Sequence, residues 1–124
     1  MKLVYVAAPY WHPDPAVIKD RVIDTKTAVA NLLRDERVAV IAPTVAGHAY
    51  EETVVDLKKA LDVDYWYESG LKKLSVCDEM YITLLDGWSR SRGVRLEIDY
   101  AQEHNIPLFF LSADGYKSKV EGEL

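Results

Sequence analysis

The stretch Leu3-Val4-Tyr5-Val6-Ala7-Ala8, which ends at Pro9, decides the fold class of this chain. It is a short, continuous apolar run, and a proline stops it. Such a run is typical of a strand that is buried on both faces, because a half-exposed strand would alternate apolar with polar residues. Strands buried in this way belong to parallel sheets with helices on both sides.

The rest of the chain alternates between helix-like and strand-like patterns. Asp14-Pro15 predicts a helix start, and apolar residues then recur every three or four positions until about Arg34. Further strands are expected at Arg37–Ala42, Glu79–Leu85 and Pro107–Leu111, and further helices at Asp64–Val76, Val94–His104 and, as a short element, within Glu51–Leu61. We expect a loop over 44–50 and a polar tail over 112–124 that packs weakly or frays.

These patterns predict a single α/β domain over residues 1–124. It should have three layers, α/β/α, around a parallel sheet of four or five strands, as in flavodoxin-like and Rossmann-like folds. Ligands of such folds bind beyond the carboxyl ends of the strands. Function is therefore sought in the segments that follow the strands, chiefly Ala8-Pro9-Tyr10, Pro43-Thr44 and Asp86-Gly87-Trp88.

Composition and charge exclude several classes of protein. The 15 basic and 20 acidic residues give a net charge of -5, which argues against long nucleic acid as a partner but allows a small anion at a local basic cluster. No apolar run reaches the length of about 18 residues that a membrane span needs, and no secretory signal opens the chain. One cysteine and three scattered histidines predict no metal, no cofactor and a reducing, cytoplasmic location.

A phosphate site is predicted in the second half of the chain and not after the first strand. Residues 9–13 contain no glycine, which excludes the dinucleotide-binding and P-loop motifs. A Ser/Arg/Gly-rich turn over 86–93 leads into a helix, and the first N–H groups of a helix favour an anion. The candidate groups are the N–H groups of Gly93 and Val94, which we expect to be unpaired, the hydroxyl of Ser91, and the cations Arg90 and Arg92. A solvated basic turn is the alternative.

Glu97 is the candidate catalytic carboxylate. On the expected helix, Val94, Ile98 and Ala101 form the buried arc, and Glu97 falls at the edge of that arc, one turn from the helix start. It should therefore point along the top of the sheet and not into open water. A partly buried carboxylate in a cleft is a candidate nucleophile or base. The alternative is a first-turn glutamate that stabilises the helix dipole.

Other candidate ligand contacts follow from position at the strand ends. Tyr10, Asp86 and His48 are predicted to bind the substrate, and His48 is better placed than His12. Tryptophans near this edge are candidates to stack on an aromatic ligand, although core packing is the expected role of any single one of them. They are Trp11, Trp66 and Trp88.

The outer face of the same helix carries two large apolar residues, Leu96 and Tyr100. Apolar groups on an outer face favour an interface with a second copy, so we expect a homo-oligomer. Scattered surface apolar residues, which are common, are the alternative.

Two motifs give the chain a resemblance to a known superfamily. They are Val4-Tyr5-Val6-Ala7-Ala8-Pro9-Tyr10 and Gly87-Trp88-x-x-Ser91-x-Gly93-Val94-x-x-Glu97. On these motifs the chain resembles the N-(deoxy)ribosyltransferase-like proteins over about Leu3–Leu111. That superfamily includes nucleoside 2-deoxyribosyltransferases and 2'-deoxynucleoside 5'-monophosphate N-glycosidases, and the chain is most similar to its short phage and bacterial members.

The resemblance implies a function and assigns roles. Glu97 would attack the anomeric carbon of the sugar, with Tyr5 beside it, and Ser91 and Gly93 would hold a 5'-phosphate. The expected function is hydrolysis of the N-glycosidic bond of (deoxy)nucleoside 5'-monophosphates. Transfer of the sugar to another base, or nucleotide binding without catalysis, are the alternatives. Members of the superfamily associate, which also favours a homo-oligomer.

The chain departs from the superfamily at one position. Members commonly carry an aspartate eight residues before the aspartate of the Cys-Asp pair, here Cys77-Asp78, and this chain has Gly70 there. The resemblance gives that aspartate a role in sugar binding and proton transfer. An acid would then have to come from elsewhere, and the candidates are Glu68, Asp64, Asp86 and His48.

Overall fold

The four predicted strands form one parallel sheet in the computed structural model, which describes residues 1–124. In chain order the elements are β1 (Lys2–Ala7), α1 (Pro15–Asp35), β2 (Val38–Ile41), α2 (Pro43–Thr53), α3 (Leu57–Ala60), α4 (Val63–Leu74), β3 (Glu79–Thr83), the 3-10 turn η1 (Trp88–Arg90), α5 (Arg92–Glu103), β4 (Leu108–Leu111) and β5 (Lys117–Lys119). The strand order is β2-β1-β3-β4-β5, and only β5 runs antiparallel to its neighbour.

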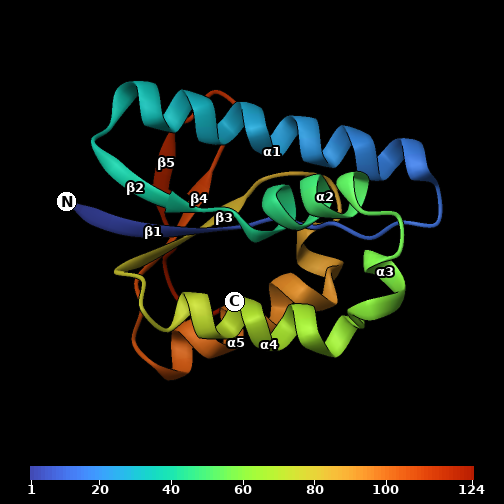
Figure 1. Ribbon diagram of the computed structural model, residues 1–124. Helices are drawn as coiled ribbons and strands as arrows, with labels where there is room; N and C mark the ends of the chain where they lie inside the picture. Colours follow the sequence, from blue (N-terminus) through green and yellow to red (C-terminus); the bar gives the residue numbers. More distant parts are fainter.

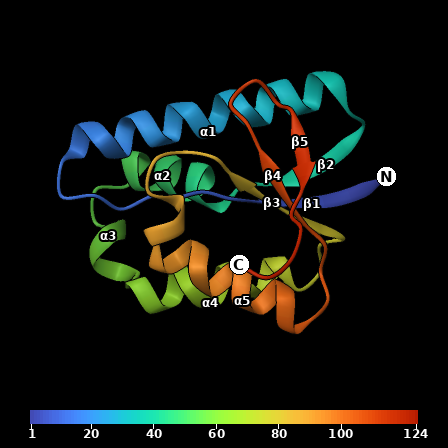
Figure 2. The same cartoon turned by 180° about the vertical axis from the view of Figure 1, so that it is seen from behind.

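Helices cover both faces of this sheet, which confirms the three-layer α/β prediction. Figure 1 shows α1 along one face and α4 with α5 along the other, and Figure 2 shows the same layers from behind. The remaining helices, α2 and α3, lie near the carboxyl ends of β1 and β2. No helix is both long enough and apolar enough to cross a membrane.

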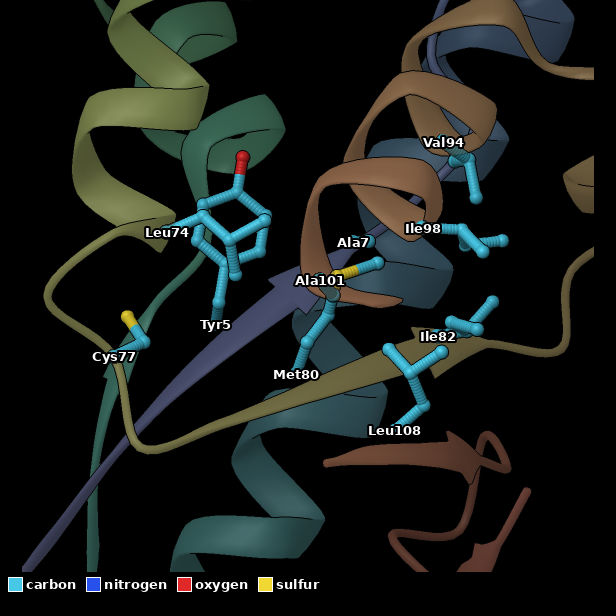
Figure 3. Packing of buried hydrophobic residues seen from close by; sticks show 10 residues of the cluster. All are labelled: Tyr5, Ala7, Leu74, Cys77, Met80, Ile82, Val94, Ile98, Ala101 and Leu108. Atoms are coloured by element: carbon cyan, nitrogen blue, oxygen red, sulfur yellow. The ribbon is translucent and has the colours of Figure 1, made fainter. Parts of the chain in front are cut away.

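Strand β1 explains why the sheet needs a helix layer on each side. Val4 and Val6 point into the cluster under α1, while Tyr5 and Ala7 point into the cluster under α4 and α5. All four side chains are at most 1% exposed. Figure 3 shows the second cluster, in which the β1 residues meet Met80 and other apolar side chains from β3, α4 and α5. The predicted two-sided burial of this strand is confirmed.

The helix starts follow from local capping. The Asp14 side chain accepts a hydrogen bond of 2.9 Å from the N–H of Ala16, so α1 begins where it was predicted. Helix α4 begins earlier than predicted, because Asp62 and not Asp64 is its N-cap. The Asp62 carboxylate accepts from the N–H of Tyr65 at 2.8 Å.

Residues 44–50 are helical, so the predicted loop is wrong. They lie inside α2, which has no side-chain cap and contains Gly47. Tertiary packing stabilises this helix against its weak propensity: a Cβ added at Gly47 would lie 3.2 Å from the Trp66 ring of α4. The short helix expected within Glu51–Leu61 is α3.

The polar tail is also more ordered than predicted. Residues Lys117–Lys119 pair with β4 as an antiparallel edge strand. The chain reverses at Gly115, whose φ of 85° is in the left-handed region. A Cβ at this glycine would lie 2.7 Å from the backbone of Asn31, and the Asn31 side chain donates to the carbonyl of Ala113 at 3.0 Å. Helix α1 therefore anchors the tail.

Candidate active site

A cavity of about 980 Å³ opens at the carboxyl edge of the sheet, where this fold class binds its ligands. Its walls come from the segments after β1 and β3 and from parts of α1, α2, α3, α4 and α5. Pockets for small molecules range over about 300–1,000 Å³, so the volume suits a ligand as large as a nucleotide. The cavity brings together most of the predicted site residues: Tyr5, Tyr10, His48, Asp86, Arg90, Ser91, Arg92, Gly93 and Glu97.

The centre of the cavity is a hydrogen-bonded pair, Tyr5 and Glu97. Tyr5 lies on β1, and its hydroxyl donates to Oε2 of Glu97 on α5. In Figure 3 the hydroxyl oxygen of Tyr5 points away from Met80 of the core. No lysine, arginine or histidine lies within ion-pair distance of Glu97. The predicted orientation of Glu97, half-buried and away from bulk water, is confirmed.

The two oxygens of Glu97 have different surroundings. Oε2 accepts from Tyr5, whereas no protein group donates to Oε1. The only fully buried side-chain polar atom that lacks a hydrogen bond is Oγ1 of Thr44. Oε1 of Glu97 also lacks a partner, so it is not fully buried. Oε1 therefore faces the open cavity, where a ligand atom can reach it.

Burial sets the protonation of this pair. It raises the pKa of Glu97 to about 7, and the hydrogen bond from Tyr5 opposes that rise. Burial and the neighbouring carboxylate raise the pKa of Tyr5 well above its ordinary value. Tyr5 consequently keeps its proton and acts as a permanent donor, while Glu97 changes charge near neutral pH.

Gly70 lies directly against this pair. A Cβ added at Gly70 would be 2.9 Å from the Tyr5 hydroxyl and 3.8 Å from Oε2 of Glu97. The position at which the resemblance implies an acid thus lies beside this pair, but the Tyr5 hydroxyl occupies the space in front of it. Glycine is what allows α4 to approach the pair.

The predicted phosphate site lies at the start of α5. The N–H groups of Arg92 and Gly93 have no acceptor in the chain, and Ser91 is the N-cap. The guanidinium of Arg92 lies 5.7 Å from the centre of the Tyr67 ring, which packs against Gly93. Two N–H groups, a hydroxyl and an unpaired cation therefore converge at one end of the cavity.

Two predicted contacts are wrong. Val94 was expected to offer a free N–H group, but that N–H donates to Oγ of Ser91 at 3.3 Å and the side chain is buried in the core. Trp88 does not line the cavity; its ring packs on Phe110, with ring centres 5.4 Å apart. The alternative of core packing holds for Trp88, whereas Trp11 and Trp66 do line the cavity.

A second polar group lines another wall of the cavity. The Tyr10 hydroxyl lies 2.9 Å from Nδ1 of His48 on α2, and Nε2 of His48 pairs with the Glu52 carboxylate. Burial and the charges of Glu51 and Glu52 raise the pKa of Tyr10 to about 12.

Comparison with known proteins gives one family. The model of the family described as "Domain of unknown function (DUF1937)" matches residues 2–113. This chain belongs to that family. A search of curated proteins found no match. The matched region contains β1 to β4, all the helices and every residue of the cavity.

This DUF1937 chain also has a cavity residue that sequence reasoning missed, Arg21. Its guanidinium donates to the carbonyl of Trp11 at 2.9 Å and to that of Asp86 at 3.3 Å, and it pairs with no carboxylate. Gly87, at φ 90°, makes room for it, because a Cβ there would lie 2.6 Å from the guanidinium. Arg21 follows Ile18 by three residues on the inward stripe of α1. A cation among the apolar residues of a helix stripe is the sequence feature that could have identified Arg21.

The DUF1937 chain does not carry the expected outer apolar face on α5. Leu96 lines the cavity, and Tyr100 packs against the core cluster and stacks on His104 at 3.9 Å. The reasoning from these two residues to an interface is therefore wrong, and homo-oligomerisation stays a prediction that rests on the resemblance.

Proposed function

We propose that this protein hydrolyses the N-glycosidic bond of nucleoside or deoxynucleoside 5'-monophosphates with Glu97 as the nucleophile. The observation that carries the proposal is the state of Glu97. It is a half-buried carboxylate without a cation, held through one oxygen by Tyr5 and open to the cavity through the other. A structural glutamate would normally have a cationic partner or full hydration.

The chemistry needs a carboxylate at this kind of position. Cleavage of a glycosidic bond passes through a state in which C1' carries positive charge. Oε1 of Glu97 would bond to C1' as the C1'–N bond breaks, and the electron pair of that bond leaves on the base, which takes up a proton. Water then attacks C1' and gives up a proton to solvent, the ester bond to Glu97 breaks, and the products are the sugar phosphate and the free carboxylate.

The charged end of the cavity supports a phosphorylated substrate. The N–H groups of Arg92 and Gly93, the Ser91 hydroxyl and the unpaired guanidinium of Arg21 all border the cavity. Hydrogen bonds from charged donors to phosphate are among the strong ones. A nucleoside without phosphate would leave the N–H groups of Arg92 and Gly93 without an acceptor from the ligand.

Gly70 favours a second candidate function, nucleotide binding without turnover. The resemblance implies an acid at this position, and here the space holds the Tyr5 hydroxyl. Without a proton donor for the base, the site could hold a nucleotide and not cleave it. A second base in place of water would give transfer of the sugar, the third outcome of the same site.

The test is the release of free base, which is measured by chromatography. The substrates are ribo- and deoxyribonucleoside monophosphates and their nucleosides, each with and without a second base as acceptor. We expect release that requires the 5'-phosphate and falls by more than about 10³-fold in Glu97→Gln, because the variant loses the nucleophile.

The matched control is Glu79→Gln. Glu79 is also a buried carboxylate that accepts from a tyrosine, but it lies outside the cavity, and its variant should release base at the wild-type rate. Saturable binding of a monophosphate without release by wild type would establish the binding function instead. Equal release by wild type and Glu97→Gln would contradict the role of Glu97.

A further inference from the structure

A chain of three polar side chains runs from the surface into the cavity. The Glu52 carboxylate, on a side chain that is 68% exposed, pairs with Nε2 of His48, and Nδ1 of His48 lies 2.9 Å from the Tyr10 hydroxyl. The two rings meet edge to face with centres 5.9 Å apart. Tyr10 comes from the loop after β1 and His48 from α2, so two elements hold the chain of groups.

The order of the partners defines the proton positions. Glu52 can only accept, so Nε2 of His48 carries a hydrogen, and in the neutral ring Nδ1 accepts from the Tyr10 hydroxyl. When the ring takes up a second proton, Nδ1–H donates to the Tyr10 oxygen. The Tyr10 O–H is then free to donate to a ligand in the cavity.

We infer that Tyr10 donates the proton to the departing base, and that His48 and Glu52 supply it. This inference rests on the proposed function. Tyr10 and His48 both border the cavity, but the two ring nitrogens of His48 are engaged by Tyr10 and Glu52. Tyr10 would therefore be the catalytic residue, and His48 and Glu52 would act through it. The relay would replace the acid that the resemblance implies at Gly70.

The other acids considered from the sequence are badly placed. Glu68 and Asp64 are exposed on α4 and do not line the cavity. Asp86 borders it, but its carboxylate is fully exposed and lies 3.8 Å from Arg90. Of the four candidates, His48 is the one that lines the cavity and is also hydrogen-bonded to a second cavity residue, Tyr10.

The proton transfers balance in this scheme. As the C1'–N bond breaks, the base nitrogen takes the proton of the Tyr10 hydroxyl, and the Tyr10 oxygen takes the proton of His48 Nδ1. His48 ends neutral and is protonated again from solvent beside Glu52. The charged groups near this path are Glu51 and Glu52 of α2 and Lys58 of α3, which lies 3.9 Å from Glu51.

A change of leaving group tests the relay. One substrate is a natural nucleoside monophosphate, and the other is the 4-nitrophenyl glycoside of the same sugar phosphate, whose phenolate leaves without a proton. Tyr10→Phe and His48→Gln should lower kcat/KM for the natural substrate by about 10²–10³-fold, the usual size of acid catalysis, and leave the nitrophenyl substrate within about fivefold. Glu52→Gln, an exposed change that preserves the fold, should show the same selectivity with a smaller loss.

His104→Gln is the matched control, because this histidine also contacts a tyrosine, Tyr100, but lies at the C-terminal end of α5, outside the cavity. It should cleave both substrates at wild-type rates. Equal losses on both substrates in Tyr10→Phe and His48→Gln would show a structural role and overturn the relay, as would no loss on either. A wild-type protein that cleaves neither substrate would overturn the proposed function itself, and the relay with it.

Discussion

The sheet carries two tyrosine–glutamate pairs, one on each face, and they differ in their surroundings. Tyr81 on the α1 face donates to Glu79 at 3.1 Å, and Lys2 lies 2.9 Å from the same carboxylate. Lys117 also donates to the Tyr81 hydroxyl at 3.2 Å. On the opposite face, Tyr5 donates to Glu97, and no cation is within reach.

The difference shows that residue types alone do not define a reactive site. Glu79 pairs with Lys2 of β1 and accepts from Tyr81 of β3, so its charge has a cationic partner within the fold. Glu97 has one neutral donor and borders the open cavity, and no cation compensates its charge when it is ionised. Uncompensated buried charge is costly to the folded state, and such sites are enriched at functional positions.

The largest expected effect concerns stability against pH. The pKa of Glu97 is about 7 when folded and near the ordinary 4.5 when unfolded, so the folded state binds this proton more tightly. Its stabilising contribution is complete below about pH 4.5 and is lost as the pH rises through about 7. Between about pH 4.5 and pH 8, the free energy of unfolding of Glu97→Gln should rise relative to that of wild type by up to about 3 kcal/mol, at about 1.4 kcal/mol per pKa unit.

Urea denaturation at the two pH values measures this gain. Glu79→Gln should instead be less stable than wild type at both, because Lys2 and Tyr81 lose a charged partner. If both variants gain the same stability relative to wild type as the pH rises, the two glutamates are equivalent, and the proposed difference between their surroundings is wrong.

The next effect is expected at Gly70. Gly70→Ala should lower the free energy of unfolding by about 1–3 kcal/mol and slow base release, because the new methyl group meets the buried Tyr5 hydroxyl at 2.9 Å. Tyr5→Phe removes that hydroxyl and makes room. The double variant should therefore be more stable than Gly70→Ala alone, and a double-mutant cycle of urea denaturation measures the coupling. Additive losses would contradict the contact.

The smallest effect is a shift of the pH–rate profile. The hydrogen bond from Tyr5 lowers the pKa of Glu97, so Tyr5→Phe should raise that pKa. Because the nucleophile must be ionised, kcat/KM should rise with pH through about 7 in wild type, and the rise should move to higher pH in Tyr5→Phe. Tyr81→Phe, on the other face, should leave the profile in place. Equal shifts in the two variants would remove the distinction between the pairs.

The sequence predicts the parts of the fold that depend on local pattern. Apolar runs ended by proline mark β1 and β2, and Asp14-Pro15 marks the start of α1, because capping and burial are local. Residues 44–50 were misread, since their helix depends on Trp66, a residue far along the chain. The tail was misread because an edge strand made of Lys117, Ser118 and Lys119 has no apolar face to reveal it.

Prediction of the candidate site was limited in the same way, because local patterns do not reveal contacts between distant segments. Helical spacing placed Glu97 correctly, because its neighbours on α5 set its direction. Spacing could not show that Arg21 reaches the loops after β1 and β3, or that Val94 donates to Ser91. These contacts depend on how distant segments meet. The fit of Gly70 against Tyr5 is likewise visible only in three dimensions.

The strand β5 lies outside the region that the family model matches, which ends at residue 113. It covers the free edge of β4, where Phe109 and Phe110 would otherwise offer their backbone to another molecule. Lysine-rich edge strands discourage growth of a sheet from chain to chain. The tail therefore covers this edge, and we expect a protein shortened to residues 2–113 to expose the backbone of β4 and to aggregate more readily.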